Sequence, residues 1–137
     1  MADISKTPAN VLAGINATIQ RAIAGATIAA GDTLYHDPAD NRLKLCDANG
    51  SAIISKFKGI ALNGAAAGQP VNYVAEDAEL AIGATVAAGV VLVCSSTPGG
   101  ICPVADIATG MYVTVLGVMG ANNKLVLKPS ASGVIAA

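Results

Sequence analysis

Short apolar segments alternate with clusters of turn residues along most of the chain. The segments 33–36 and 43–46 are joined by Asp37-Pro38-Ala39-Asp40-Asn41. Asp-Pro and Asp-Asn are turn formers, so this stretch predicts a β-hairpin. Segments 90–94 and 101–104, joined by Thr97-Pro98-Gly99-Gly100, predict a second hairpin.

Four further strands are expected, over 53–62, 70–75, 111–118 and 124–128. Many short strands separated by turn residues are typical of an all-β fold. The pattern therefore predicts a small β-barrel or β-sandwich-like domain.

The chain also repeats itself. Gly25–Leu34 matches Gly83–Leu92 at an offset of 58, through the shared phrase Gly-Ala-Thr-x-Ala-Ala-Gly. Gly59-Ile60-Ala61 meets Gly117-Val118-Met119 at the same offset. The segment 43–47 aligns with 102–106 at an offset of 59. A solenoid needs about three or more copies, so a long period present twice predicts a pseudo-symmetric domain instead.

These matches divide the chain into three parts. A single β domain is expected over 25–128, built of repeat units 25–75 and 83–128. Residues 1–24 are expected to form an extended N-terminal arm, over about 1–16, that runs into a first strand. A helix is the competing reading of this segment, but Gly14 interrupts its spacing. The C-terminal tail, 129–137, is expected to be arm-like.

Composition narrows the class of protein. The chain has 137 residues, of which 53% are hydrophobic, 12% charged and 3% aromatic, and its net charge is −1. No basic cluster offers a track for phosphates, so we expect no nucleic-acid partner. A small monomer cannot bury all the hydrophobic surface of a chain this apolar, which favours a homo-oligomer.

The charge deficit lies in the second unit. Between Leu80 and Asn123 the only charged residue is Asp106. We therefore expect this unit to face the core or a subunit interface. The candidate interface residues are Val90, Val91, Leu92, Ile101, Val104, Met111 and Val113.

Membrane insertion is not expected. The longest apolar run, Leu80–Cys94, is shorter than the roughly 20 residues that a spanning helix needs. The N-terminal residues lack a signal-peptide pattern, so the expected location is the cytoplasm or a particle assembled there.

Few residues carry catalytic chemistry. A Ser-His-Asp triad needs a base, and the only histidine is His36, next to a predicted hairpin tip. No nucleotide-binding or GxSxG motif is present. We therefore expect no enzymatic activity and no cofactor.

Metal and thiol sites are also poorly supported. Cys46, Cys94 and Cys102 have no CxxC spacing and are read as small buried hydrophobes, with a Cys94–Cys102 contact across the hairpin as the alternative. A group of turn residues is assigned to turn chemistry, with a weak cation site as the alternative, because the EF-hand spacing is absent. The group comprises Asp37, Asp40 and Asp47 with Asn41 and Asn49. No metal is expected.

Two polar segments remain. The acidic cluster Glu76-Asp77-Ala78-Glu79 is read as a solvated loop, with a contact to a basic partner as the alternative. Lys56 and Lys58 lie in a predicted strand rather than at a hairpin tip, which argues against a lipoyl- or biotinyl-type carrier.

The order of four phrases resembles a known family. They are Ala24–Tyr35, Gly59–Val71, Pro98–Asp106 and Val115–Val118, within a similarity that spans about 11–133. Together they are similar to small head proteins of tailed bacteriophages, the capsid decoration or cement proteins.

The resemblance implies a structural virion protein that binds the outside of the capsid and stabilises it. Its partners would be the major capsid protein and further copies of itself, commonly as a trimer, on a particle assembled in the host cytoplasm. A flexible arm could pair with an exposed strand edge of the capsid. The candidate contact residues in that arm are Ile4, Thr7, Pro8, Val11, Leu12 and Ile15. The alternatives are a tail or accessory adhesive virion protein and, more remotely, a small carrier or hydrolase.

Overall fold

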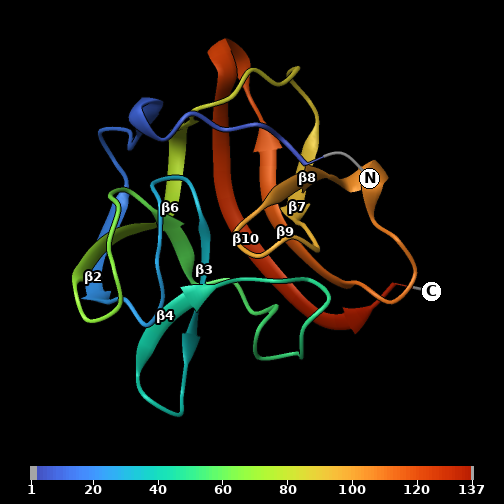
Figure 1. Ribbon diagram of the computed structural model, residues 1–137. Coiled ribbons are helices and arrows are strands. Elements are labelled where there is room, and N and C mark those ends of the chain that lie inside the picture. Colours follow the sequence, from blue (N-terminus) through green and yellow to red (C-terminus); the bar gives the residue numbers. More distant parts are fainter. Residues whose placement is uncertain (1–2, 137) are drawn as a thin grey trace.

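The protein is built of ten strands (Figure 1). The computed structural model describes residues 3–136. Within those residues there is no α-helix, only three single turns of 3₁₀-helix. The all-β expectation is confirmed, and the antiparallel sheet curls into a half-barrel. The strands are β1 (Val11–Leu12), β2 (Thr18–Ile23), β3 (Thr33–Asp37), β4 (Arg42–Leu45), β5 (Gly59–Ala61), β6 (Pro70–Ile82), β7 (Val91–Cys94), β8 (Ile101–Pro103), β9 (Tyr112–Met119) and β10 (Lys124–Ile135). The 3₁₀ turns are η1 (Pro8–Asn10), η2 (Val104–Asp106) and η3 (Ala121–Asn123).

The strand order is symmetric about its middle. It runs β4-β3-β5-β6-β10-β9-β7-β8. The first half consists of the hairpin β3–β4, the third strand β5 and the fourth strand β6. The second half consists of the hairpin β7–β8, the third strand β9 and the fourth strand β10, in the reverse spatial order. In Figure 1 the first half lies on the left and the second on the right, joined where β6 pairs with β10. Among residues 3–136 no helix is long and apolar enough to cross a bilayer.

The registers of the hairpin, and of its first strand with the third strand, correspond residue by residue in the two halves. Thr33 is opposite Ile60, and 58 positions later Val91 is opposite Val118. The hairpin partners follow the same rule. In the first half Leu34, Tyr35 and His36 pair with Leu45, Lys44 and Leu43. In the second half the equivalent residues Leu92, Val93 and Cys94 pair with Pro103, Cys102 and Ile101. The offset is therefore 58 in the hairpins too. The alignment at 59 was wrong by one residue, because Leu43 corresponds to Ile101.

The repeated glycines explain part of this correspondence. Gly31 and Gly89 have φ values of +94° and +89°, where a side chain is strained. Gly31 N–H donates to the Ala61 carbonyl at 2.8 Å, and Gly89 N–H donates to the Met119 carbonyl at 2.7 Å. Each glycine thus turns the chain into the first strand of its half while bonding to the third strand.

Side chains of moderate size fill the interior. The main cluster lies between the halves and combines Cys46, Phe57 and Ile60 with residues of the second half such as Leu92 and Leu116. A smaller cluster inside the first half includes Leu34, Leu43 and Tyr73. Leucine, isoleucine and methionine are the largest fully buried residues, as the low aromatic content requires.

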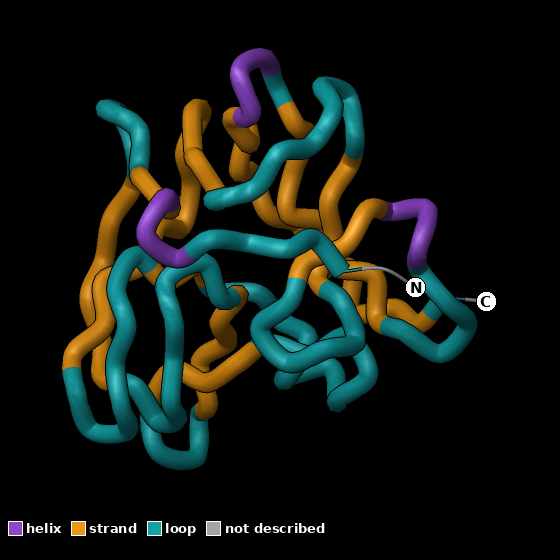
Figure 2. Tube along the Cα trace, turned by 45° about the horizontal axis from the view of Figure 1, so that its top comes forward, coloured by secondary structure: helices purple, strands orange, loops and turns teal. Residues whose placement is uncertain are grey.

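The first residues are packed against the sheet. The segment 3–10, called here the N-terminal strap, crosses the molecule from β8 to η1 (Figures 1 and 2). Ile4 N–H donates to the Ile101 carbonyl at 2.8 Å, and Thr7 N–H donates to the Gly83 carbonyl at 2.7 Å. Val11 then pairs with Ile82 in β6. The expected free arm over about 1–16 is therefore corrected for residues 3–12; Met1 and Ala2 lie outside the described residues.

The strap and the segment after β2 cover equivalent edges of the sheet. Ile4 bonds to the carbonyl of Ile101, and Gly25 N–H bonds at 2.7 Å to the carbonyl of Leu43, the counterpart of Ile101 in the first half. Ala24 also forms a parallel bridge with Leu43. These contacts satisfy edge carbonyls that an open sheet would present to other chains.

Three further expectations are corrected. Residues 53–55 form a turn and 56–58 are irregular, so only Gly59–Ala61 of the expected strand 53–62 is a strand. The acidic cluster 76–79 lies inside β6 rather than in a loop. The tail from residue 129 continues β10 as far as Ile135, which pairs with Tyr112 of β9.

Gly117 provides a test of the close packing between β9 and β10. Its φ is +155°, and a Cβ placed there would collide with the backbone carbonyl of Val126. We expect Gly117→Ala to lower the free energy of unfolding by roughly 3 kcal/mol or more, because backbone atoms cannot move aside as a side chain can. Urea unfolding followed by circular dichroism measures the loss.

Gly64→Ala is the matched control for that substitution. A Cβ at Gly64 has the Ile28 carbonyl at 3.5 Å as its nearest contact, and its φ is not positive. Its stability should change by no more than about 0.5 kcal/mol. Equal effects of the two substitutions would contradict the proposed collision.

Candidate binding face

Three valines lie side by side on the outer face of the second half. Val118 of β9 is the register partner of both Val91 in β7 and Val126 in β10. Directly opposed residues of an antiparallel pair project to the same face, so the three side chains form a row. Val118 and Val126 are each 43% exposed, and Val91 is half-buried.

The row continues across β6 to the loop between β1 and β2. Ala78 and Val126 line two shared shallow hollows of about 250 and 320 Å³. A third hollow, of about 200 Å³, joins Ala78 to Ile15. Ile15 is 96% exposed. We call Ile15, Ala78, Val91, Val118 and Val126 the apolar strip.

The local sequence of β10 shows why this face is apolar. Leu125 and Leu127 point into the core and are buried, while Val126 between them points outward. A strand with one solvated face carries polar residues at alternate positions, whereas a strand covered on both faces is apolar throughout. Among the outward positions of this strand, Lys124 and Lys128 are polar and Val126 is the apolar exception, as expected of a local contact patch.

Charged side chains border the strip. Glu76 and Glu79 of β6 and Lys124 and Lys128 of β10 line the same hollows. Within residues 3–136 the only salt bridges are those of Lys44, so these four groups form none. An apolar centre with a polar rim is the usual layout of a protein–protein contact surface.

Only one of the predicted arm residues contributes to this strip. Ile15 does, and Leu12 is also exposed, at 62%. Ile4 is half-buried against the main core, and Val11 is buried. Thr7 and Pro8 are exposed at the start of η1.

The predicted subunit-interface residues separate into two groups. Leu92, Ile101 and Met111 are buried within this chain, so they support the surface rather than form it. Val104 is exposed, at 42%, while Val90, Val91 and Val113 are half-buried. Val118, Val126 and Ala78 were missed by the sequence analysis, although the run Leu125-Val126-Leu127 was a signal for the outer face.

The groups considered for catalysis are dispersed. His36 is exposed on β3, and no cluster of three His, Cys, Asp or Glu residues suited to a metal ion occurs in the described part of the chain. Lys44 Nζ lies 2.7 Å from Asp37 and 3.2 Å from Asp40. Its hydrogen bond to Asp37 lowers the pKa of that carboxyl. The turn carboxylates are thus paired with a lysine.

All three cysteines are free and buried. Cys102 is opposite Val93 in the hairpin, whereas the Cys94 Sγ lies 3.5 Å from that of Cys46. The hydrogen bond with Cys46, together with burial, raises the pKa of Cys94. Burial raises the pKa of Cys102 to about 11. Thiols held in the protonated form are poor nucleophiles, so these are packing groups.

Comparison with known proteins adds no family assignment. No protein-family model matches the chain. No curated protein matches it either.

The raised thiol pKa predicts a loss of stability at alkaline pH. The ordinary pKa of 9.0 applies to unfolded Cys102, and the folded value is about 11. The thiol's contribution to stability is therefore complete below pH 9 and is lost as the pH rises through 11. Between about pH 8 and pH 11 we expect wild-type stability to fall by about 1–2 kcal/mol more than that of Cys102→Ala.

Urea unfolding of both proteins across this range measures the difference. Titrating groups that do not interact with Cys102, such as Lys6, are common to the two proteins, so their contributions cancel in the comparison. Cys102 also raises the pKa of Cys94, so the measured difference includes that smaller contribution. Parallel stability profiles would contradict the assignment to Cys102.

Proposed function

We propose that this chain is a structural, non-enzymatic virion protein that binds the outside of a tailed-bacteriophage capsid and stabilises it. The observation that carries the proposal is the apolar strip, a row of aliphatic side chains left exposed on the sheet's outer face. The resemblance of the sequence to capsid decoration proteins supports the same role. The partner is the major capsid protein, and the location is the capsid surface of a particle assembled in the host cytoplasm.

The chemistry of the strip suits attachment to a repeated protein surface. Its members are small or β-branched and sit on rigid strands, so little side-chain entropy is lost when they are covered. A capsid presents many copies of one surface, and an oligomer seated on several copies is retained far more strongly than one subunit. Modest apolar contacts are then sufficient.

A second apolar area is available for contacts between subunits. Val134 and Ile135 near the end of β10 are 62% and 50% exposed. The Ser132 hydroxyl donates to the Val113 carbonyl at 2.6 Å and accepts from Val134 N–H at 3.1 Å, which holds these residues together. We propose that this end of β9 and β10, together with Val104, forms the contacts of a homotrimer.

Substitutions in the strip test the attachment. Ile15→Glu combined with Val126→Glu should weaken binding at least about tenfold, because two carboxylates would be desolvated against the capsid. Binding is measured by co-sedimentation with capsids, stripped of this protein, of the phage that encodes the chain. Stability should change by less than about 1 kcal/mol, because both positions are exposed.

Ile19→Glu combined with Ile23→Glu is the control for this experiment, because both residues are exposed on β2, at 52% and 41%, and lie outside the strip and the proposed trimer contacts. Equal retention of the strip variant and the wild type would contradict attachment through the strip. Electron microscopy of particles labelled with an antibody to the chain separates the capsid from the alternative tail location. Label on tails alone would overturn the capsid assignment.

The mass in solution tests the homotrimer. Light scattering should give about three times the subunit mass of 13.4 kDa. Val134→Glu combined with Ile135→Lys should shift the mass towards the monomer, because both apolar contacts are lost. A stable monomer at high micromolar concentration would contradict the trimer.

A further inference from the structure

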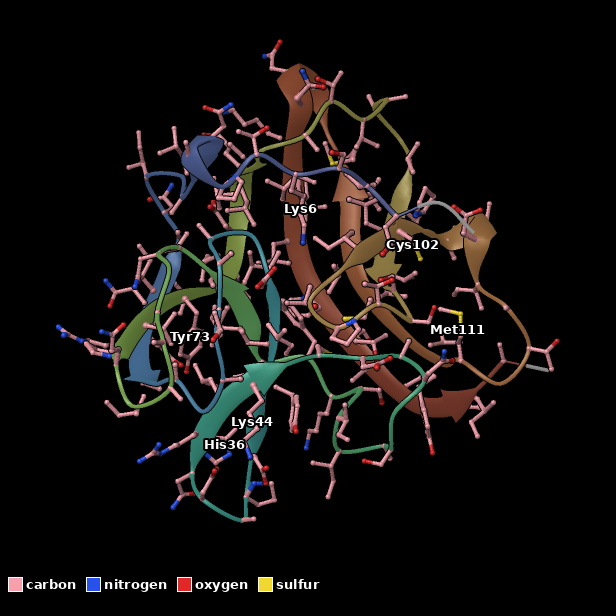
Figure 3. All side chains as sticks on the ribbon, in the orientation of Figure 1. Lys6, His36, Lys44, Tyr73, Cys102 and Met111 are labelled. Carbon is pink, nitrogen blue, oxygen red and sulfur yellow. The ribbon has the colours of Figure 1, made fainter. Side chains whose placement is uncertain are left out.

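A cleft with a cationic rim lies on elements that do not contribute to the apolar strip. Its volume is about 370 Å³, within the range of ligand-binding pockets. The lining residues come from β3, the turn after it and the loop 51–58: His36, Pro38, Ile53, Lys56, Phe57 and Lys58. Figure 3 places His36 and Lys44 at this end of the molecule, away from Lys6 and Met111.

The loop that carries the two lysines is firmly held. Phe57, the only phenylalanine, is 9% exposed and packs into the main core. On its C-terminal side, Lys58 N–H donates to the Leu34 carbonyl at 2.7 Å. On its N-terminal side, the buried Thr114 hydroxyl donates to the Ser55 carbonyl at 2.7 Å. Both lysines are thus presented from a fixed backbone, which lowers the entropic cost of binding.

The cleft has no acid of its own. Lys56 and Lys58 are exposed and take part in none of the salt bridges within residues 3–136. Asp37 and Asp40 are close in sequence to the lining residue Pro38, and their carboxylates lie 2.7 and 3.2 Å from Lys44 Nζ. The two ammonium groups therefore create an uncompensated positive potential at the mouth of the cleft.

The rest of the lining identifies the kind of anion. Ile53 is 52% exposed and lies with Pro38 in the cleft, so an apolar group is accommodated beside the negative charge. Phe57 lines the cleft but is only 9% exposed, which leaves little of its ring for stacking a base and argues against single-stranded nucleic acid. A peptide with alternating acidic and aliphatic side chains satisfies both features.

We propose that this cleft binds an acidic peptide segment of a partner protein, with carboxylates at Lys56 and Lys58 and an aliphatic side chain against Ile53 and Pro38. This inference goes beyond the proposed function, because it rests on a different surface and does not require the partner to be a capsid. The cleft would give the protein a second, charge-selective contact.

The test uses the full chain labelled with ¹⁵N and the capped peptide Glu-Leu-Asp-Glu-Leu-Asp as the probe. We expect amide shifts at His36, Asp37 and 53–58 that saturate. Lys56→Gln combined with Lys58→Gln should weaken the affinity at least about tenfold. The matched control, Lys124→Gln with Lys128→Gln, removes the same charge elsewhere and should change it less than about twofold.

Several outcomes would overturn the proposal. No saturable shift at the cleft would show that the peptide does not bind there. An equal loss of affinity in both double variants would show that only overall charge matters. Equal affinity for a peptide with serine in place of leucine would contradict the contact between the aliphatic side chain and Ile53. Inorganic phosphate or an oligothymidine that binds the cleft more tightly than the peptide would assign it to another class of ligand.

Discussion

Hydrogen bonding on both edges of strand β6 is the constraint on which the rest of the structure depends. One edge pairs with β2 and then β1, and the other pairs with β5 and then β10. The partners change near Asp77, which is 4% exposed. Its carboxylate accepts from Gly14 N–H at 2.6 Å and Glu79 N–H at 2.9 Å. A buried carboxylate thus bonds to backbone donors where the ladder is interrupted, as buried polar groups must. Because β6 belongs to both halves, neither half has a complete sheet without the other.

Lys6 adds a second link between the halves. Its Nζ donates to the Gly31 carbonyl at 2.7 Å and to the Gly99 carbonyl at 2.9 Å, one in each half (Figure 3). Burial lowers the pKa of this lysine, and the nearby Asp32 and Asp3 partly offset that effect. Loss of the strap would remove the lysine donor from the buried Gly31 carbonyl, at a cost of about 1–3 kcal/mol for a buried group left unpaired. The Gly99 carbonyl would keep its hydrogen bond from Thr33 N–H at 3.1 Å. The N-terminal residues of the strap are therefore part of the fold, and the proposed binding role is assigned instead to exposed positions such as Ile15.

The two proposed contact surfaces use different chemistry because the two halves differ in charge. The second half is almost free of charged residues, and its outer face offers only aliphatic contact along the strip. The first half carries Lys44, Lys56 and Lys58, of which only Lys44 is paired with acids. Apolar area supplies affinity, whereas unpaired charge supplies selectivity and speeds encounter. A protein seated on a repeated surface benefits from both, since each copy must bind and must also adopt one orientation.

The sequence by itself determined the β class, the two hairpins and the repeat, because these follow from local rules: turn residues, alternating apolar positions and glycines at recurring places. It failed where distant contacts override those rules. Residues 53–58 alternate like a strand, yet Phe57 is held in the core by packing while the backbone around it turns. The acidic cluster 76–79 looked like a loop, but Glu76 pairs with β2 and Asp77 with β10, so the cluster lies within β6. Only the tertiary structure decided that the first residues form a strap and that Val126 lies between Val118 and Ala78, with Ile15 next to Ala78. It also decided that Lys56 and Lys58 share a cleft with His36. These placements depend on the partners that β6 and the strap select, and pairing across the sheet is a long-range choice that no local pattern encodes.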